Sequence, residues 1–415
     1  MRVVLFVAGV FLPLLALHAK AEESFMASEL LFPVEQNVNH HGSCVVELPN
    51  GDVLVTWNQG AGERGHNIAI MGARKLKRGG AFTERFVMAD TPNVPDNNAS
   101  MVVDGQARLW IFWSTLLARD FETAQMHYKV STNFCMPSGP PEWDLMQNLF
   151  LEPDKVVAAS GLDAEVEVPQ PGNFEDVVRG KFKTLLGADA TEEQRARVEE
   201  YGKMAGDRLV RRMGWFGRAH SKILEDGRMI LGLYSDGFNF SLAAISDDGG
   251  ATWHSSEPIV GWGNVQPSFA QKQDGTLVAY FRDNGPAPKR VMVAESRDRG
   301  ESWGPVYDHP LLPNPGSGLE VANLSDGLWI CVYNDLEEAR YSLAVSLSDD
   351  EGKTWKWTRH LERMKMGDGV FHYPSIVEGR NGRLHVSYSY QLKHPTEQKS
   401  IKYATFNREW VKQGD

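Results

Sequence analysis

Cysteine and basic residues are scarce in this 415-residue chain, and each scarcity excludes a class of protein. Its three cysteines, Cys44, Cys135 and Cys331, fit neither a disulfide framework nor the spacing of a metal site, so we expect buried thiols and neither a metal nor another cofactor. The 43 Lys and Arg residues against 54 Asp and Glu give a formal net charge of -11. Such an acidic chain is a poor candidate for binding nucleic acid or an anionic membrane, although a few local arginines can still hold an anionic ligand.

Long apolar runs are also lacking, apart from one at the N-terminus. The run from Val3 to Leu17 follows Arg2 and precedes Ala19-Lys20-Ala21, which is the pattern of a secretory signal with its cleavage site. The run is too short to span a membrane as a helix. We therefore expect residues 1–21 to be a signal peptide. The mature protein, residues 22–415, would then be exported to the periplasm or the cell exterior without membrane insertion.

What the sequence does contain is a repeated eight-residue segment, S-x-D-x-G-x-(S/T)-W. It occurs at residues 246–253, 296–303 and 348–355, and the closing tryptophans lie roughly 50 residues apart, a period found in propeller blades. A hairpin signal, Asp-Gly between two apolar runs, precedes each copy, and Asn-Gly or Asp-Gly recurs in the same setting elsewhere. The dipeptides are Asn50-Gly51, Asp104-Gly105, Asp226-Gly227, Asp274-Gly275, Asp326-Gly327 and Asn381-Gly382.

These signals predict an all-β fold, a six-bladed β-propeller with four strands in each blade. A strand near Leu31 to Glu35 is expected to join the last blade, which is built around Ile401 to Phe406. Between the second and third blades the strand pattern stops, and residues 150–214 read as a helical insertion. Asn173 can cap a helix from Phe174 to Leu186, and Thr191 with Gln194 makes a capping box for a second helix from Glu192 to Met213. The insertion is either a lid or, as we expect, a packing appendage without chemistry.

Strand direction predicts where a ligand would bind. The turns and the repeats share one face, whereas the starts of the inner strands and the loops after the second strands meet on the other face, around the channel. Counting back nine residues from each turn glycine places six residues at the channel mouth: Gly42, Asp96, Arg218, Gln266, Gly318 and Tyr373. Two residues further along, the same strands carry Cys44, Asn98, His220, Ser268, Glu320 and Ser375. The loops add Glu63, Asp236, Arg282, Asp283 and Arg340. Arginines, carboxylates and a tyrosine gathered there can form a site for a carboxylated sugar.

On these motifs the chain resembles the sialidase (neuraminidase) superfamily, in particular its exported bacterial members, over nearly all of its length except the insertion. The repeats are similar to the Asp-box (BNR repeat) of that family. Tyr373, in Phe371-His-Tyr-Pro-Ser-Ile376, stands where sialidases carry their nucleophilic tyrosine. Arg282 and Arg340 fall on two arginines of the family's carboxylate-binding triad.

The chain departs from the family at three places. His41-Gly-Ser43 replaces an Arg-Ile-Pro segment, Gln266 replaces the glutamate that activates the tyrosine, and the loop Gly62-Glu-Arg-Gly-His-Asn67 lacks the acid/base aspartate. These departures affect the expected mechanism more than the expected fold. The fold is indicated by the Asp-boxes, which are turn motifs and lie outside the three departures.

The resemblance implies a retaining exo-glycosidase that removes terminal sialic acid or a related acidic sugar with a tyrosine nucleophile. We expect Tyr373 as nucleophile, Glu320 as its base, and Glu63 or Asp96 as the acid. Substrate contacts are expected from Arg218 (in place of the missing arginine), Arg282, Arg340, Gln266, His41, Asp236 and Asp283. Two alternatives stay open: a catalytically inactive glycan-binding propeller, favoured by Gln266 and the missing loop aspartate, and another glycan-cleaving activity on the same scaffold.

Overall fold

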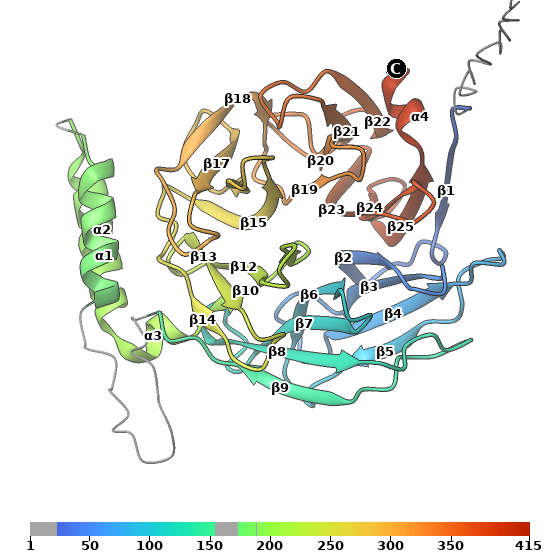
Figure 1. Cartoon of the computed structure of the whole chain (residues 1–415), viewed down its shortest axis with the longest axis horizontal. Coiled ribbons are helices and arrows are strands. Elements are labelled where there is room, and N and C mark those ends of the chain that lie inside the picture. Colours follow the sequence, from blue (N-terminus) through green and yellow to red (C-terminus); the bar gives the residue numbers. More distant parts are fainter. Residues whose placement is uncertain (1–22, 154–172, 188) are drawn as a thin grey trace, which may run out of the picture.

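The chain folds into six sheets arranged as blades around a central channel (Figure 1). The structure, a computed structural model, describes residues 23–153, 173–187 and 189–415. The expected signal peptide lies outside these described residues. The prediction of a six-bladed propeller is confirmed.

Each blade is an antiparallel sheet whose strands follow one another outward from the channel. Blade 1 contains β2 (Asn39–Glu47), β3 (Val53–Gly60), β4 (Ala69–Lys75) and β5 (Phe86–Ala89). Blade 2 contains β6 (Asp96–Val103), β7 (Leu109–Leu116), β8 (Ala124–Ser131) and β9 (Leu145–Leu149), with the 3-10 turn η1 (Phe121–Thr123) between β7 and β8. Blade 3 has a divided inner strand and consists of β10 (Trp215–Phe216), β11 (Lys222–Ile223), β12 (Met229–Ser235), β13 (Phe240–Ser246) and β14 (His254–Ser255).

The remaining blades are regular. Blade 4 contains β15 (Asn264–Gln271), β16 (Leu277–Asp283), β17 (Arg290–Ser296) and β18 (Tyr307–Pro313). Blade 5 contains β19 (Glu320–Asn323), β20 (Trp329–Tyr333), β21 (Ser342–Ser348) and β22 (Trp357–Arg363). Blade 6 contains β23 (Gly369–Glu378), β24 (Leu384–Leu392), β25 (Gln398–Phe406) and β1 (Met26–Leu30), and the short helix α4 (Arg408–Lys412) follows it.

The ring is closed by β1, which pairs with β25 from Met26–Phe406 to Leu30–Lys402. The closing strand was expected at residues 31–35, whereas the structure has it at Met26–Leu30, so the predicted position is too far along the chain. The chain bends after Leu30, and beyond the bend only isolated contacts with β25 remain, such as Leu31 N to Ile401 O at 2.9 Å. The expected pairing with the last blade is present, and the strand that makes it begins earlier.

The core lies between neighbouring blades, because the middle strands are apolar on both faces and each blade packs on the next. Ile230 and Ile245 of blade 3, for example, belong to one buried cluster with Leu277 and Ala279 of blade 4. A large apolar surface on each blade is thereby removed from water.

The three Asp-boxes are structural turns on the face opposite the inner-strand starts, as expected. In the first box Asp248 Oδ1 accepts hydrogen bonds from Thr252 N and Ser246 Oγ, each at 2.9 Å, and Ser246 Oγ accepts one from Gly250 N at 2.9 Å. Desolvation opposes ionisation, but these hydrogen bonds lower the pKa of Asp248 to about 2. The other two boxes repeat the same network. The aspartates are thus committed to their own turns.

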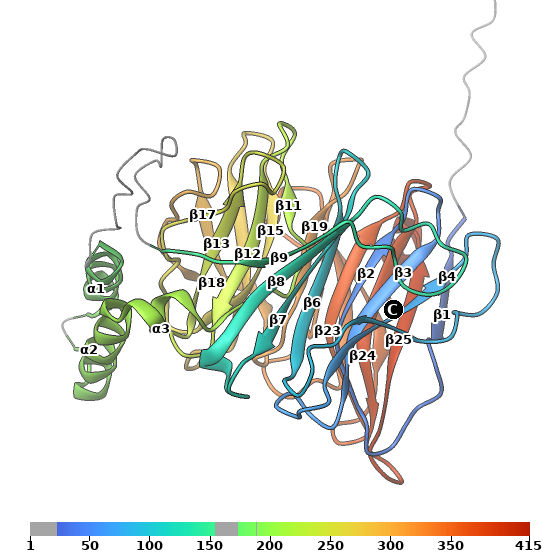
Figure 2. The same cartoon turned by 90° about the horizontal axis from the view of Figure 1, so that it is seen from below.

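The insertion contains three described helices, α1 (Asn173–Leu185), α2 (Glu192–Gly206) and α3 (Arg208–Arg212). The capping box of Thr191 and Gln194 is confirmed. The single helix expected from Glu192 to Met213 is wrong, because the side chain of Asp207 accepts from Leu209 N and Val210 N and so begins a new helix. The helices lie outside the ring beside blade 3 and do not cover the channel (Figures 1 and 2).

Two further expectations concern the whole chain. All three cysteines are free, but only Cys44 and Cys331 are buried, so the expectation of a buried thiol is wrong for Cys135, which is exposed. In the part of the chain that the structure describes, no helix combines the length and apolar character that crossing a membrane requires.

Candidate active site

A pocket of about 1070 Å³ opens at the face where the inner strands begin. Every blade contributes to its wall, with residues such as His41, Asn98, Asp236, Arg282, Arg340 and Tyr373. The volume is at the upper end of the roughly 300 to 1,000 Å³ of ligand pockets. The pocket thus opens on the face where strand direction predicts a ligand site.

Four inner strands share one irregularity at the floor of this pocket. A β-bulge interrupts β2, β6, β15 and β23. Each bulge contains one residue with a positive φ angle: Gly42 at 64°, Asn98 at 55°, Gln266 at 57° and Tyr373 at 54°. A bulge redirects a side chain, and a positive φ at a residue other than glycine costs about 1 kcal/mol or more. Such strain, repeated around one pocket, is typical of a functional site.

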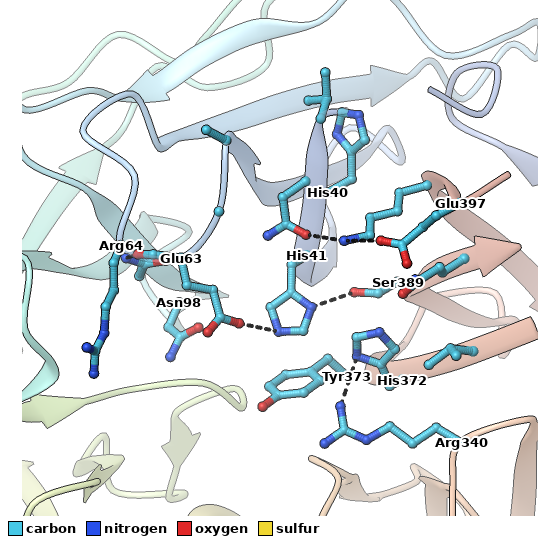
Figure 3. Close-up of a pocket in the computed structure, with 18 of the residues that line it drawn as sticks. His40, His41, Glu63, Arg64, Asn98, Arg340, His372, Tyr373, Ser389 and Glu397 are labelled. Atoms are coloured by element: carbon cyan, nitrogen blue, oxygen red, sulfur yellow. Dashed lines mark hydrogen bonds and ion pairs between the residues drawn. The ribbon is translucent and has the colours of Figure 1, made fainter. Parts of the chain in front are cut away.

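Tyr373 lies at the centre of the pocket floor. Its Oη accepts hydrogen bonds from Arg282 Nη1 at 2.8 Å and Gln266 Nε2 at 3.2 Å. The His41 ring lies 4.3 Å from the Tyr373 ring between centroids, and the Arg340 guanidinium carbon lies 5.7 Å from the Tyr373 ring centre (Figure 3). Both bonded partners are donors, so they stabilise negative charge on Oη. Among the described residues, no carboxylate is hydrogen-bonded to it.

Two arginines contact Tyr373. Arg282, at the end of β16, donates to the hydroxyl, and Arg340, just before β21, lies over the ring. Arg282 Nη2 donates to Asn284 Oδ1 at 3.3 Å, and Arg340 Nη2 donates to Gly316 O at 2.7 Å. Each guanidinium keeps part of its surface open to the pocket. Two partly desolvated arginines beside one another favour a carboxylate ligand.

Glu63 and His41 are in contact at the rim, with His41 Nε2 and Glu63 Oε1 separated by 3.2 Å (Figure 3). Burial lowers the pKa of His41 to about 4, although Glu63 opposes the shift. Burial, with His41 and Arg340 nearby, also holds the pKa of His372 well below its usual value. Both rings are therefore neutral near pH 7. Glu63 is 48% exposed and lines the pocket.

Asp236 lies on the opposite wall, in the turn between β12 and β13. The Asp236 side chain is exposed to the pocket, but the surrounding wall limits its hydration. Desolvation raises its pKa, and Arg282 opposes the shift.

Of the residues predicted from the sequence, seven line the pocket: His41, Glu63, Asp236, Gln266, Arg282, Arg340 and Tyr373. Asp96, Arg218, Asp283 and Glu320 do not, and each has a physical reason.

Asp96 is wholly buried in blade 2 beside the pocket. It accepts hydrogen bonds from Thr91 N at 2.6 Å, Trp113 Nε1 at 3.1 Å and Thr115 Oγ1. The turn after β6 has the same length as the other hairpin turns, but Ala107, at φ 56°, holds the position that glycine has in the others, and Gly105 lies two residues earlier. Counting from Gly105 therefore misplaces the register by two residues. Asn98 stands at the mouth instead and donates to Tyr234 Oη at 2.8 Å.

Glu320 lies in the channel below the pocket floor and cannot serve as the base for Tyr373. Its Oε1 accepts from His220 N at 2.7 Å and lies 2.8 Å from His220 Nδ1, and its Oε2 accepts from Ile376 N at 2.8 Å. Gly318, not Glu320, is the residue level with Tyr373, and two residues of strand place Glu320 about 7 Å deeper. Burial opposes the charge of each partner, yet each holds the other ionised: the pKa of Glu320 is lowered and that of His220, beside Cys44 and Glu320, is raised.

Arg218 and Asp283 also face away from the pocket. Arg218 lies under the floor and donates to Pro374 O at 3.0 Å and to Leu319 O. It occupies space left free by Gly318, where a Cβ would lie 3.0 Å from Arg218 Nε. Asp283 follows Arg282 on β16, so strand alternation directs it to the other side, where it accepts from Gly285 N at 2.7 Å and Arg290 N at 3.1 Å.

The sequence did not reveal Tyr234 and His372 as part of the site, and it placed Asn98 on an inner strand of the channel without assigning it to the site. Tyr234 accepts from Gln266 Nε2 at 3.3 Å, and it lies two residues before Asp236, so strand parity could have indicated it. His372 could not be found in this way, because only the bulge lets it and Tyr373 face the pocket together.

A cluster of possible metal ligands lies elsewhere, at Asp247, His254 and Glu301, whose ligand atoms are within 4.8 Å of one another. Arg228 already occupies it, with Nε 2.6 Å from Asp247 and Nη1 2.9 Å from Glu301. The carboxylates are therefore neutralised by a guanidinium, which disfavours a cation there.

Comparisons with known proteins support this fold. Residues 205–386 match the family model of the BNR repeat-like domain. None of the curated proteins compared with the chain shows significant sequence similarity. A protein of unknown function from Dyadobacter fermentans superposes with a TM-score of 0.63 at 13% identity, over 92% of this chain and 97% of the other. The NanB sialidase from Streptococcus pneumoniae gives 0.61 at 12% identity, over 90% and 69%. An α-L-arabinofuranosidase from Fusarium graminearum gives 0.57 at 11% identity, over 94% and 99%.

Proposed function

Since the chain is a sialidase-like propeller with a BNR repeat-like domain, we propose that it is an exported glycosidase that removes a terminal acidic sugar, such as sialic acid, from glycans. The observation that carries this proposal is Tyr373 Oη, which accepts a 2.8 Å hydrogen bond from Arg282 at the floor of a large polar pocket.

In this site the two arginines hold the sugar carboxylate, and Tyr373 attacks the anomeric carbon beside it. A phenol suits this carbon because a neutral nucleophile avoids repulsion by the adjacent carboxylate, as in known sialidases. Arg282 and Gln266 donate hydrogen bonds that orient Tyr373 Oη. As Oη bonds to the anomeric carbon, the bond from that carbon to the leaving oxygen breaks and the phenol proton passes to solvent. Glu63, at the rim, donates a proton to the leaving oxygen and then activates the water that releases the sugar.

A second candidate is a glycan-binding propeller without turnover. One observation favours it: the residue that contacts Tyr373 Oη where a base would stand is Gln266, which cannot accept a proton. Its amide nitrogen lies between the hydroxyls of Tyr373 and Tyr234, at 3.2 and 3.3 Å.

The two candidates separate in one experiment on the wild-type protein and Gln266→Glu. Hydrolysis of a fluorogenic α-sialoside is measured, together with binding of free sialic acid by calorimetry. A glycosidase hydrolyses the sialoside, and Gln266→Glu gains at least about tenfold in kcat because a carboxylate base is restored. Binding without turnover in both proteins would identify a binding propeller, and absence of both would refute an acidic-sugar site.

A further inference from the structure

The helical insertion contacts the propeller at blade 3, and its contacts lead to the pocket wall. Phe174 of α1 packs against Phe238, with ring centroids 6.0 Å apart, and Phe182 of α1 packs against Trp262 at 5.2 Å. All of these helix residues belong to a buried cluster that is shared with blades 2 and 3. The insertion is therefore part of the core and not a loosely attached segment.

The first contact supports the turn that carries Asp236. This turn runs from Ser235 to Asn239 and is closed by hydrogen bonds from Asn239 N to Ser235 O at 2.8 Å and from Phe238 N to Ser235 Oγ at 3.2 Å. Phe238 is 1% exposed and points into the cluster of the insertion, while Asp236, two residues earlier, lines the pocket. The turn is thus held on one side by the insertion and presents its other side to the ligand.

The second contact supports the segment that carries Arg282. Trp262 precedes Gly263, whose carbonyl accepts a hydrogen bond from Asn284 N at 2.8 Å. The backbone of the two segments is so close that a Cβ on Gly263 would lie 2.3 Å from Gly285 N. Displacement of Trp262 would therefore move the chain just after Arg282.

A side-chain relay joins the two supported segments. Asn284 Nδ2 donates to Asn239 Oδ1 at 2.8 Å, and Asn284 Oδ1 accepts from Arg282 Nη2 at 3.3 Å. The other end of the same guanidinium, Nη1, donates to Tyr373 Oη. Asn239 adopts φ 54°, a strained conformation that directs its amide at Asn284.

We propose that the helical insertion is a positioning element of the pocket, which fixes Arg282 through Phe238, Asn239, Trp262 and Asn284. Asn239 and Asn284 are positioning residues, since they touch Arg282 or each other and neither is among the residues that line the pocket. The insertion is neither a lid nor a passive appendage. It determines how accurately the pocket presents a guanidinium to an acidic sugar.

The relay is tested by a double-mutant cycle on Asn239→Ala and Asn284→Ala, with free sialic acid as the probe in calorimetry. Each single variant is expected to raise the Kd about 3- to 10-fold, and the double variant no more than Asn284→Ala alone, because residues acting in series are not additive. Asn148→Ala is the matched control, since Asn148 pairs with His127 on the exposed outer part of blade 2 and should leave the Kd unchanged. Additive effects, or none, would overturn the relay.

The contribution of the insertion itself is tested with Phe182→Leu, and Leu209→Ala in α3 is the control because that side chain is 68% exposed. Amide hydrogen exchange, measured well below the unfolding temperature, should become at least about threefold faster at residues 236–239 and 282–285 in Phe182→Leu only. Lower thermal stability with unchanged exchange in those segments would show a merely structural role and overturn the proposal. The affinity measurement rests on the proposed function, but the exchange measurement does not. If sialic acid fails to bind the wild-type protein, exchange still decides the matter.

Discussion

Two layers of side chains line the channel, only about 7 Å apart along the inner strands, and they differ in what their polar groups contact. In the upper layer Tyr373, Gln266 and Asn98 sit in strained bulges and face the pocket. In the lower layer His220, Glu320 and Ser375 bond across blades: Glu320 contacts Ile376 N at 2.8 Å, and Ser375 Oγ accepts from Val45 N at 3.2 Å.

The difference shows that the depth of a residue in the channel, and not its type, decides whether its side chain faces the pocket or bonds across blades to support the fold. A buried carboxylate whose two oxygens are both held by fixed donors is kept away from a substrate. Glu320 is such a group, whereas the half-exposed Glu63 is not. Four experiments would break or sharpen this distinction.

The largest effect is expected from Tyr373→Phe in the upper layer. Removal of the nucleophilic oxygen should lower kcat on a fluorogenic sialoside by at least about 10³-fold, while binding of free sialic acid changes little. Tyr234→Phe is the matched control, because Tyr234 contacts the same Gln266 but does not contact Arg282. Activity retained in Tyr373→Phe would remove the tyrosine mechanism.

Glu320→Ala should act on folding instead of catalysis. It leaves His220 charged and buried and deprives Ile376 N of its acceptor, which should cost about 3 to 5 kcal/mol in the free energy of unfolding, measured with urea. Glu337→Ala, which removes an exposed partner of Arg290, should cost about 1 kcal/mol or less. If Glu320→Ala kept full stability and lost all turnover, Glu320 would be a catalytic base after all.

Arg282→Lys should weaken binding of sialic acid by about 1.5 to 3 kcal/mol, because an ammonium cannot bond Tyr373, Asn284 and a carboxylate as a planar guanidinium can. Arg64→Lys at the rim, where Arg64 is 55% exposed and pairs with Asp120, should change affinity little. Equal losses in the two variants would indicate general electrostatic attraction and no specific clamp.

The smallest effect is a pH dependence of stability that belongs to the lower layer. The pKa of His220 is raised in the folded state, so the stability it contributes is fully present below its unfolded pKa of about 6.5 and is lost as pH rises through the folded value. His41 acts in the opposite direction: its pKa of about 4 lowers stability as pH falls from roughly 6.5 toward 4. The urea concentration at the midpoint of unfolding, measured as a function of pH, should fall as the pH rises in the wild-type protein but not in His220→Gln.

The fold was predictable because its signals are local. An Asn-Gly or Asp-Gly turn and a closing tryptophan depend on a few neighbouring residues, and six repetitions leave one architecture. Helix α2 was predictable for the same reason, from Thr191 and Gln194. The break at Asp207 was not, since Asp207 is compatible with a helix interior until its carboxylate finds Leu209 N and Val210 N.

The site was less predictable because it depends on register and depth. A turn glycine that lies two residues earlier than usual, Gly105, exchanged Asp96 for Asn98, and strand alternation directed Asp283 away from Arg282. The bulges suspend that alternation, so His372 and Tyr373 face the same pocket. Arg282 and Arg340 were found because they lie near strand ends that converge on the channel whatever the local register. Tyr373 lies inside β23 and was found because Gly382 has the usual position in its turn.

The pairing of β1 with β25 also determines when, during synthesis, the ring of blades can close. Strand β1 is synthesised before the other described strands and its partner, Gln398–Phe406, after them, so the ring cannot close until all six blades have been made. Pairing across such a sequence separation is slow, and the open edges of the first and last blades are exposed to association in the meantime. The rings of His41 and Tyr373, 4.3 Å apart, stand on the two sides of this seam. We therefore expect the pocket to be completed only when the ring closes, and a chain that stops before Gln398 should contain most of the blades but no complete pocket.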